Sequence, residues 1–167
     1  MRQMSEPDLE VLYTRLEKPV YNVLYRKVWN REEARDLVQE TFIRLWKMRR
    51  KVVMDTVEPL VYRIALNLAK SKLRRRKLLG WVPFEAVAGM VPDTRGMETE
   101  MSRGEERIHL REAVMALPGD LRNVILLCEF TGMKYEQIAE ALSIPEGTVG
   151  SRRNRALKKL KVHLERL

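Results

Sequence analysis

A pattern of two short helices separated by a tight turn constrains the fold of this chain more than any other feature. It spans residues 135–160 and reads YEQIAEALSIPEGTVGSRRNRALKKL. Apolar residues fall where two crossing helices would meet, and the small Ala139 stands where their backbones would approach closely. The residues after Val149 are mostly polar or basic, and such residues contact phosphates and base edges in a major groove. The stretch predicts a helix-turn-helix whose second helix begins near Glu146.

The charge of the chain favours a polyanionic partner. Of its 167 residues, 32 are Lys or Arg and 23 are Asp or Glu, which gives a formal net charge of +9. The charge is also clustered, because residues 60–84 contain many bases and no acid. Charge of one sign along a helix is typical of a nucleic-acid footprint, whereas a solvated helix end usually mixes in glutamate. We therefore predict a second DNA-binding helix in this segment.

Apolar residues recur at three- and four-residue steps through most of the chain, which predicts an all-α protein. In residues 1–80 we expect a domain of three helices. The first begins near Asp8 and contains Pro19, which predicts a kink or a break. Asn30 is a capping residue type before the second helix, and Pro59 stands in the first turn of the third.

The second half of the chain predicts a linker followed by a four-helix domain. Residues 81–104 carry proline and glycine at short intervals, which favours a linker, and the first part is apolar enough to serve as a docking element. Residues 105–167 show two helical patterns before the helix-turn-helix, and Gly132 is placed to end the second of them. The predicted fold class is therefore two small helical domains joined by a linker.

The sequence lacks the features of a secreted or membrane protein. Cys128 is the single cysteine, so the chain forms no intrachain disulfide and no cysteine-rich zinc site. No apolar run approaches the roughly 20 residues that span a bilayer. The charged N-terminus also lacks the apolar segment of a signal peptide. We therefore expect no membrane insertion and a cytoplasmic location.

Two other functions are weighed against a DNA-binding module. A metal-dependent nuclease or recombinase would use Asp36, Gln39 and Glu40, but no second acidic cluster is visible to complete a two-metal site. We expect no catalytic residues, no metal ligands and no cofactor. A dimeric helix-turn-helix regulator would need a dimerisation helix beyond its DNA-binding domain, and the sequence shows none.

The order of these features resembles a bacterial RNA polymerase sigma factor of the extracytoplasmic-function (ECF) type, within the sigma-70 family. These small factors keep two of the promoter-binding domains. Residues 35–42, RDLVQETF, are similar to the family's polymerase-binding helix, and residues 63–69 followed by 73–76 are similar to its minus-10 recognition helix. The minus-35-binding domain is matched by Leu117-Pro118, Arg122, Tyr135, Ile138-Ala139, Ile144-Pro145, residues 147–149, Ser151-Arg152 and Arg155-Ala156.

This resemblance implies a transcription-initiation factor that is not an enzyme. Its partners would be core RNA polymerase, promoter DNA and an inhibitory anti-sigma factor. Residues 1–80 would form a sigma-2-like domain, residues 81–104 a linker that threads along the polymerase, and residues 105–167 a sigma-4-like domain. The recognition helix departs from the family's usual residues at Gly150, Arg153 and Asn154, so no particular promoter sequence is carried over.

The resemblance also implies three binding surfaces. The residues that would bind core RNA polymerase are Asp36, Gln39, Glu40 and Ile43. The residues that would bind minus-10 DNA are Arg63, Asn67, Lys70, Ser71, Arg74 and Arg75. The residues that would bind minus-35 DNA are Thr148, Ser151, Arg152, Asn154, Arg155 and Lys158.

Overall fold

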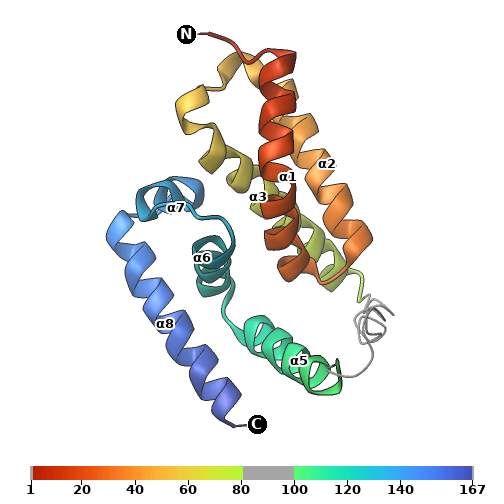
Figure 1. Ribbon diagram of the computed structural model, residues 1–167, viewed down its shortest axis with the longest axis vertical. Coiled ribbons are helices and arrows are strands. Elements are labelled where there is room, and N and C mark those ends of the chain that lie inside the picture. Colours follow the sequence, from red (N-terminus) through yellow and green to blue (C-terminus); the bar gives the residue numbers. More distant parts are fainter. Residues whose placement is uncertain (1, 81–99, 167) are drawn as a thin grey trace.

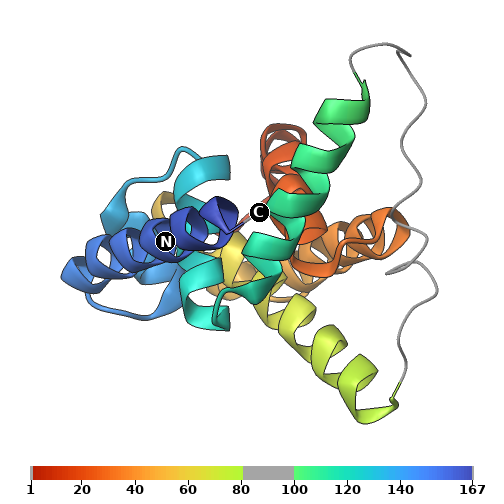
Figure 2. The same ribbon diagram turned by 90° about the horizontal axis from the view of Figure 1, so that it is seen from below.

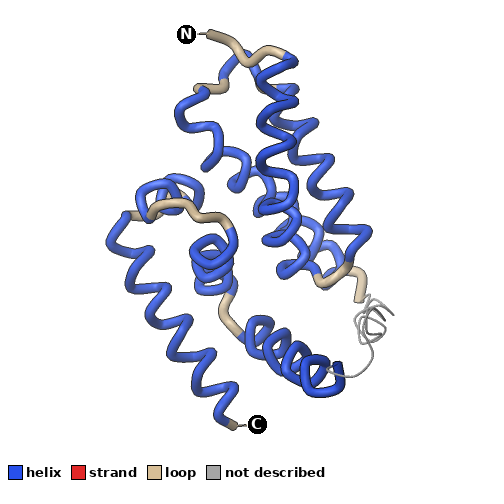
Figure 3. The backbone as a smooth tube through the Cα atoms, viewed as in Figure 1, coloured by secondary structure: helices blue, strands red, loops and turns tan. Residues whose placement is uncertain are grey.

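The computed structural model describes residues 2–80 and 100–166, and within those ranges every regular element is a helix (Figures 1 and 3). The predicted all-α fold of two small domains is confirmed. The N-terminal helices are α1 (Glu6–Val28), α2 (Arg31–Lys47) and α3 (Val57–Leu78), with short 3-10 turns at Arg49–Lys51 and Met54–Thr56. The C-terminal helices are α5 (Glu100–Ala116), α6 (Gly119–Phe130), α7 (Tyr135–Leu142) and α8 (Glu146–Glu165).

Local sequence signals set the ends of the N-terminal helices. The Asn30 side chain accepts a hydrogen bond of 2.9 Å from the Glu33 amide, so the predicted cap of α2 is confirmed. Pro19 lies inside α1, which continues past it to Val28 as one helix. One face of α2 is buried against α1 and α3, and it consists of Ala34, Leu37, Val38, Thr41, Phe42 and Leu45.

The C-terminal domain is built around α6, whose apolar residues Val124, Ile125 and Leu127 are buried. Gly132 follows α6 with φ of 69°, a left-handed conformation that a glycine adopts without strain, so the predicted helix stop is confirmed. At the other end of α6, the Arg122 guanidinium donates hydrogen bonds to the carbonyls of Val114, Met115 and Leu117. These bonds satisfy carbonyls at the end of α5 and fix the turn between the two helices.

The two domains pack against each other, an arrangement that the sequence left open. Helix α3 contacts α7, and α1 contacts α6, so the buried core continues from one domain into the other (Figure 1). Lys27 Nζ donates a 2.7 Å hydrogen bond to Asn123 Oδ1 across this interface, and the Arg26 guanidinium lies 4.0 Å from the centre of the Phe130 ring. Residues 81–99 of the predicted linker lie outside the described residues. Its last residues, 100–104, form the start of α5.

Candidate polymerase- and DNA-binding surfaces

The first candidate surface is the outer face of α2. Because Ala34, Leu37 and their helical neighbours turn inward, the intervening residues Asp36 and Gln39 are exposed, and 48% of Ile43 is exposed. Glu40 is half-buried and accepts a 2.9 Å hydrogen bond from Arg44 Nε one turn further along the helix. The four residues predicted to bind polymerase therefore lie together on one helix.

Beside this face lies an apolar groove between α1 and α2, with a volume of about 640 Å³. The lining residues from both helices include Leu9, Tyr13, Gln39, Phe42, Ile43 and Trp46. The Tyr13 and Phe42 rings meet edge to face, with their centres 4.9 Å apart. Sequence reasoning missed this groove because four of its nine lining residues come from α1, where Leu9 and Tyr13 fit an ordinary core pattern.

The second candidate surface is a stripe along α3. Arg63, Asn67, Lys70 and Arg74 recur at four- and three-residue steps, which places them on one side of the helix. Asn67, Lys70 and Arg74 are exposed, as is the adjacent Arg75, whereas Arg63 and Ser71 are half-buried. The last turns of α3 project from the rest of the domain (Figure 2), so this basic end of the helix is open to a partner.

Two neighbouring bases of α3 face the other way, toward α2. Arg76 pairs with Glu33 at the start of α2 and donates a 3.4 Å hydrogen bond to the Val28 carbonyl. Lys72 Nζ lies 3.8 Å from Glu33 Oε1. The basic segment of the sequence is thus divided into an exposed stripe and two residues that anchor α3 to α2.

Arg63 is held by the C-terminal domain. Its guanidinium Nη2 donates to the Glu140 carbonyl, and Nε donates a 3.4 Å hydrogen bond to the Ala141 carbonyl. Both carbonyls belong to the last turn of α7, where unsatisfied acceptors and the helix dipole attract a cation. A predicted minus-10 residue therefore contacts the first helix of the helix-turn-helix.

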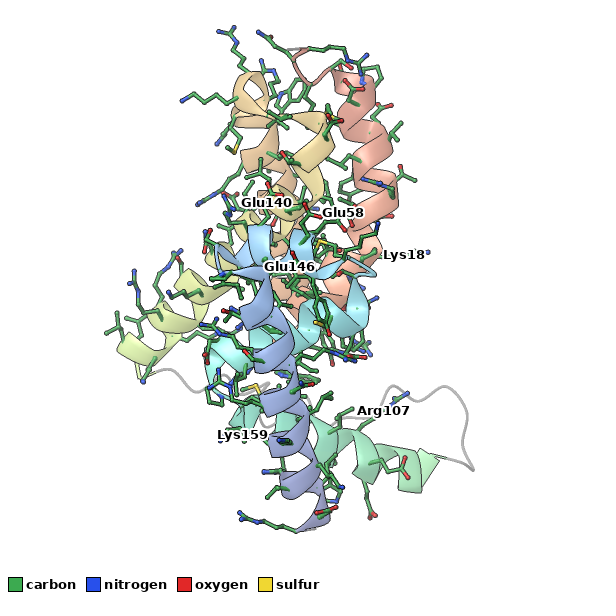
Figure 4. The ribbon with its side chains drawn as sticks, turned by 90° about the vertical axis from the view of Figure 1, so that its left-hand side faces the viewer. Lys18, Glu58, Arg107, Glu140, Glu146 and Lys159 are labelled. Atoms are coloured by element: carbon green, nitrogen blue, oxygen red, sulfur yellow. The ribbon has the colours of Figure 1, made fainter. Side chains whose placement is uncertain are left out.

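The third candidate surface is the outer face of α8. Val149 and Ala156 are fully buried, whereas Ser151, Asn154, Arg155 and Lys158 are exposed. Figure 4 shows α8 running away from the N-terminal domain, from Glu146 at its start past Lys159. The helix therefore leaves a long polar face open to a partner.

The two other predicted minus-35 residues are less open. Thr148 is half-buried, and its carbonyl accepts a 3.1 Å hydrogen bond from Ser151 Oγ. The side chain of Arg152 is 25% exposed, and Arg152 Nε lies 3.7 Å from Asp120 Oδ2 in the first turn of α6. The structure thus leaves four of the six residues exposed on α8, keeps Thr148 half-buried and turns Arg152 toward α6.

Comparison with known proteins links these surfaces to one family. Residues 12–78 match the family model for sigma-70 region 2, and residues 107–160 match that for sigma-70 region 4. The ECF RNA polymerase sigma-E factor of Haemophilus influenzae is 32% identical over 165 residues, which cover 93% of this chain and 87% of that protein. This chain is an ECF sigma factor of the sigma-70 family. Members of this family direct RNA polymerase to promoters and are not enzymes.

Two further comparisons place the sigma factor among its relatives. ECF sigma factor SigE of Mycolicibacterium smegmatis is 31% identical over 169 residues, which cover 97% of this chain but only 63% of the SigE length. The solved structure of sigma factor RpoE in complex with the anti-sigma factor NepR, from Bartonella quintana, shares the fold. Its TM-score is 0.72 at 21% identity, over 95% of this chain and 97% of that one.

Within residues 2–80 and 100–166, no group of three His, Cys, Asp or Glu side chains is arranged to hold a metal ion. Across the same residues, no helix is both long and apolar enough to cross a membrane.

Proposed function

We propose that the sigma factor binds core RNA polymerase through the outer face of α2 and the groove beside it. Asp36, Gln39 and Glu40 present acid and amide groups that suit a basic helical partner. Ile43 and the groove offer an apolar contact between these polar groups. The observation that carries this assignment is the combination of exposed acid, exposed isoleucine and an adjoining apolar groove on a single face.

We further propose that α3 lies along the minus-10 element and α8 along the minus-35 element. On α3 the contacts are Arg63, Asn67, Lys70, Ser71, Arg74 and Arg75. On α8 they are Thr148, Ser151, Asn154, Arg155 and Lys158. Arginine and lysine supply phosphate contacts that hold the protein on DNA, and Ser151, Asn154 and Arg155 supply groups for base edges.

In this proposal the two domains separate when the factor engages a promoter. Arg63 donates to carbonyls of α7 in the packed arrangement, so it is free to reach minus-10 DNA only after α7 moves away. The interface contains a buried lysine with a neutral amide partner, and burying a charge in this way opposes tight packing. The packed factor is therefore a form that precedes promoter binding.

We also propose an inhibitory anti-sigma protein as a partner, and the cytoplasm as the site of action. Support for this partner comes from the Bartonella quintana relative, whose solved structure holds an anti-sigma factor. The cytoplasm follows from the family, because bacterial RNA polymerase works there. Co-purification of the tagged factor from its native cells would identify the partner, and recovery of the factor with core polymerase alone would argue against one.

Transcription in vitro with purified core polymerase tests the function. Adding the factor should give initiation from discrete sites on genomic DNA. A lack of specific initiation on every fragment would overturn the proposal.

The double variant Asp36→Arg, Gln39→Arg should abolish binding to core polymerase, because it reverses the charge of the proposed contact. The double variant Glu105→Gln, Glu106→Arg changes the net charge equally on exposed residues of α5, and it should bind normally.

A further inference from the structure

The inner face of α8 has arginines at its centre. Helical spacing puts Val149, Arg152, Arg153 and Ala156 on the side that packs on the rest of the domain. Val149 and Ala156 are fully buried there, as an apolar seam requires. On the same face, between these two apolar residues, lie Arg152 and Arg153. Their long side chains are 25% and 34% exposed.

Both arginines reach acids on α6, at opposite ends of that helix. Arg153 donates from Nε and Nη2 to Glu129 Oε1, at 3.2 and 2.9 Å, near the end of α6. Arg152 Nε lies 3.7 Å from Asp120 Oδ2, in the first turn of α6. Helix α6 therefore lies between two consecutive arginines of α8, each paired with a carboxylate on a different side of the crossing.

Such a pair of contacts controls the angle between two helices. A single ion pair lets α8 rotate about the contact, whereas two contacts at opposite ends of α6 oppose rotation in both directions. Direct readout needs side chains placed accurately against base edges, so the crossing angle of α8 decides where Ser151, Asn154 and Arg155 point. The Arg153 guanidinium, which donates twice to Glu129, also has fewer donors left for a phosphate.

We propose that Arg152 and Arg153 are positioning residues, which orient α8 for minus-35 recognition by holding α6 between them and do not themselves contact DNA. This inference rests on the proposed function, because it assumes that α8 lies on DNA. It revises the predicted role of Arg152 and gives a role to Arg153, one of the positions at which the recognition helix departs from its family.

The dependence of promoter binding on salt separates a positioning residue from a phosphate contact. The affinity of the holoenzyme, the factor bound to core polymerase, is measured on a promoter fragment over a range of KCl concentrations. Lys158→Gln, at an exposed residue of α8 proposed as a phosphate contact, should lower the slope of log affinity against log salt by about 0.9. Arg153→Gln and Arg152→Gln should each weaken binding by about twofold to fivefold with the slope unchanged. A smaller slope for either variant would make that arginine a DNA contact and overturn the inference.

Exchange of the charges gives an independent test. Arg153→Glu should weaken promoter binding by about tenfold or more, because it puts two carboxylates together and tilts α8. Adding Glu129→Arg should restore the affinity to within about twofold, since the ion pair is rebuilt in reverse. A double variant as weak as the single one, with normal circular dichroism and thermal midpoint, would refute the positioning role. Failure of the unaltered holoenzyme to bind any promoter would instead overturn the proposed function, and the positioning role with it.

Discussion

Replacing Lys27 by methionine should change how the stability of this sigma factor responds to pH. Lys27 lies at the interface between the domains, is only 6% exposed, and has the Asn123 side-chain oxygen as its hydrogen-bond acceptor at 2.7 Å. Burial above all, together with the positive charges of Arg122 on α6 and Lys70 on α3, lowers the pKa of Lys27 from 10.5 to about 8. The folded protein therefore disfavours the charged form of this lysine.

The sign of the effect follows from proton binding. The pKa of Lys27 is about 8 in the folded state and 10.5 in the unfolded state, so the unfolded chain binds more protons between these values. Folding stability should therefore rise with pH across this window. At about 1.4 kcal/mol per pH unit, the charged lysine costs the folded state about 3 kcal/mol below the window. About 2 kcal/mol of this cost should disappear between about pH 6.5 and about pH 9.5.

Urea denaturation at several pH values measures this difference. Lys27→Met should be more stable than the unaltered protein by about 2 kcal/mol near pH 6.5, because the lost hydrogen bond to Asn123 offsets about 1 kcal/mol of the gain. This advantage should shrink by about 2 kcal/mol toward pH 9.5. Lys18→Met, on an exposed part of the same helix (Figure 4), controls for the loss of one charge. Parallel curves for Lys27→Met and the unaltered protein would refute the reasoning.

Three further substitutions test the fold by the same urea titration. Asn30→Ala removes the oxygen that accepts from the Glu33 amide and should cost about 1 kcal/mol, and no measurable loss would contradict the cap. Leu45→Ala empties a fully buried site and should cost about 2–5 kcal/mol, whereas Leu79→Ala, at 80% exposure, should cost less than about 0.5 kcal/mol. Gly132→Ala forces a side chain into the left-handed region and should cost about 1–2 kcal/mol; unchanged stability would mean that the turn relaxes.

Helix periodicity made the outer face of α2 predictable from sequence. Asp36 and Gln39 are exposed because their neighbours at helical spacing are buried, and that division depends on one helix only. The adjoining groove was not predictable in the same way. It needs Leu9 and Tyr13 of α1 to stand beside Phe42 and Trp46 of α2, and no spacing rule within one helix specifies this pairing.

The sequence by itself determined the helices, the cap at Asn30 and the stop at Gly132, because these depend on residues that lie within a few turns of one another. The order of such local motifs along the chain indicated the family. The tertiary structure decided which bases are available to DNA. Arg63 donates a hydrogen bond to a carbonyl at the end of α7, and Arg76 pairs with Glu33. Arg152 and Arg153 of the helix-turn-helix pair with acids on α6. A charge pattern along one helix predicts the side of the helix on which an arginine lies, but not the acceptor that it contacts. Those acceptors lie on other helices, and only the packing of the chain brings them close to the arginines.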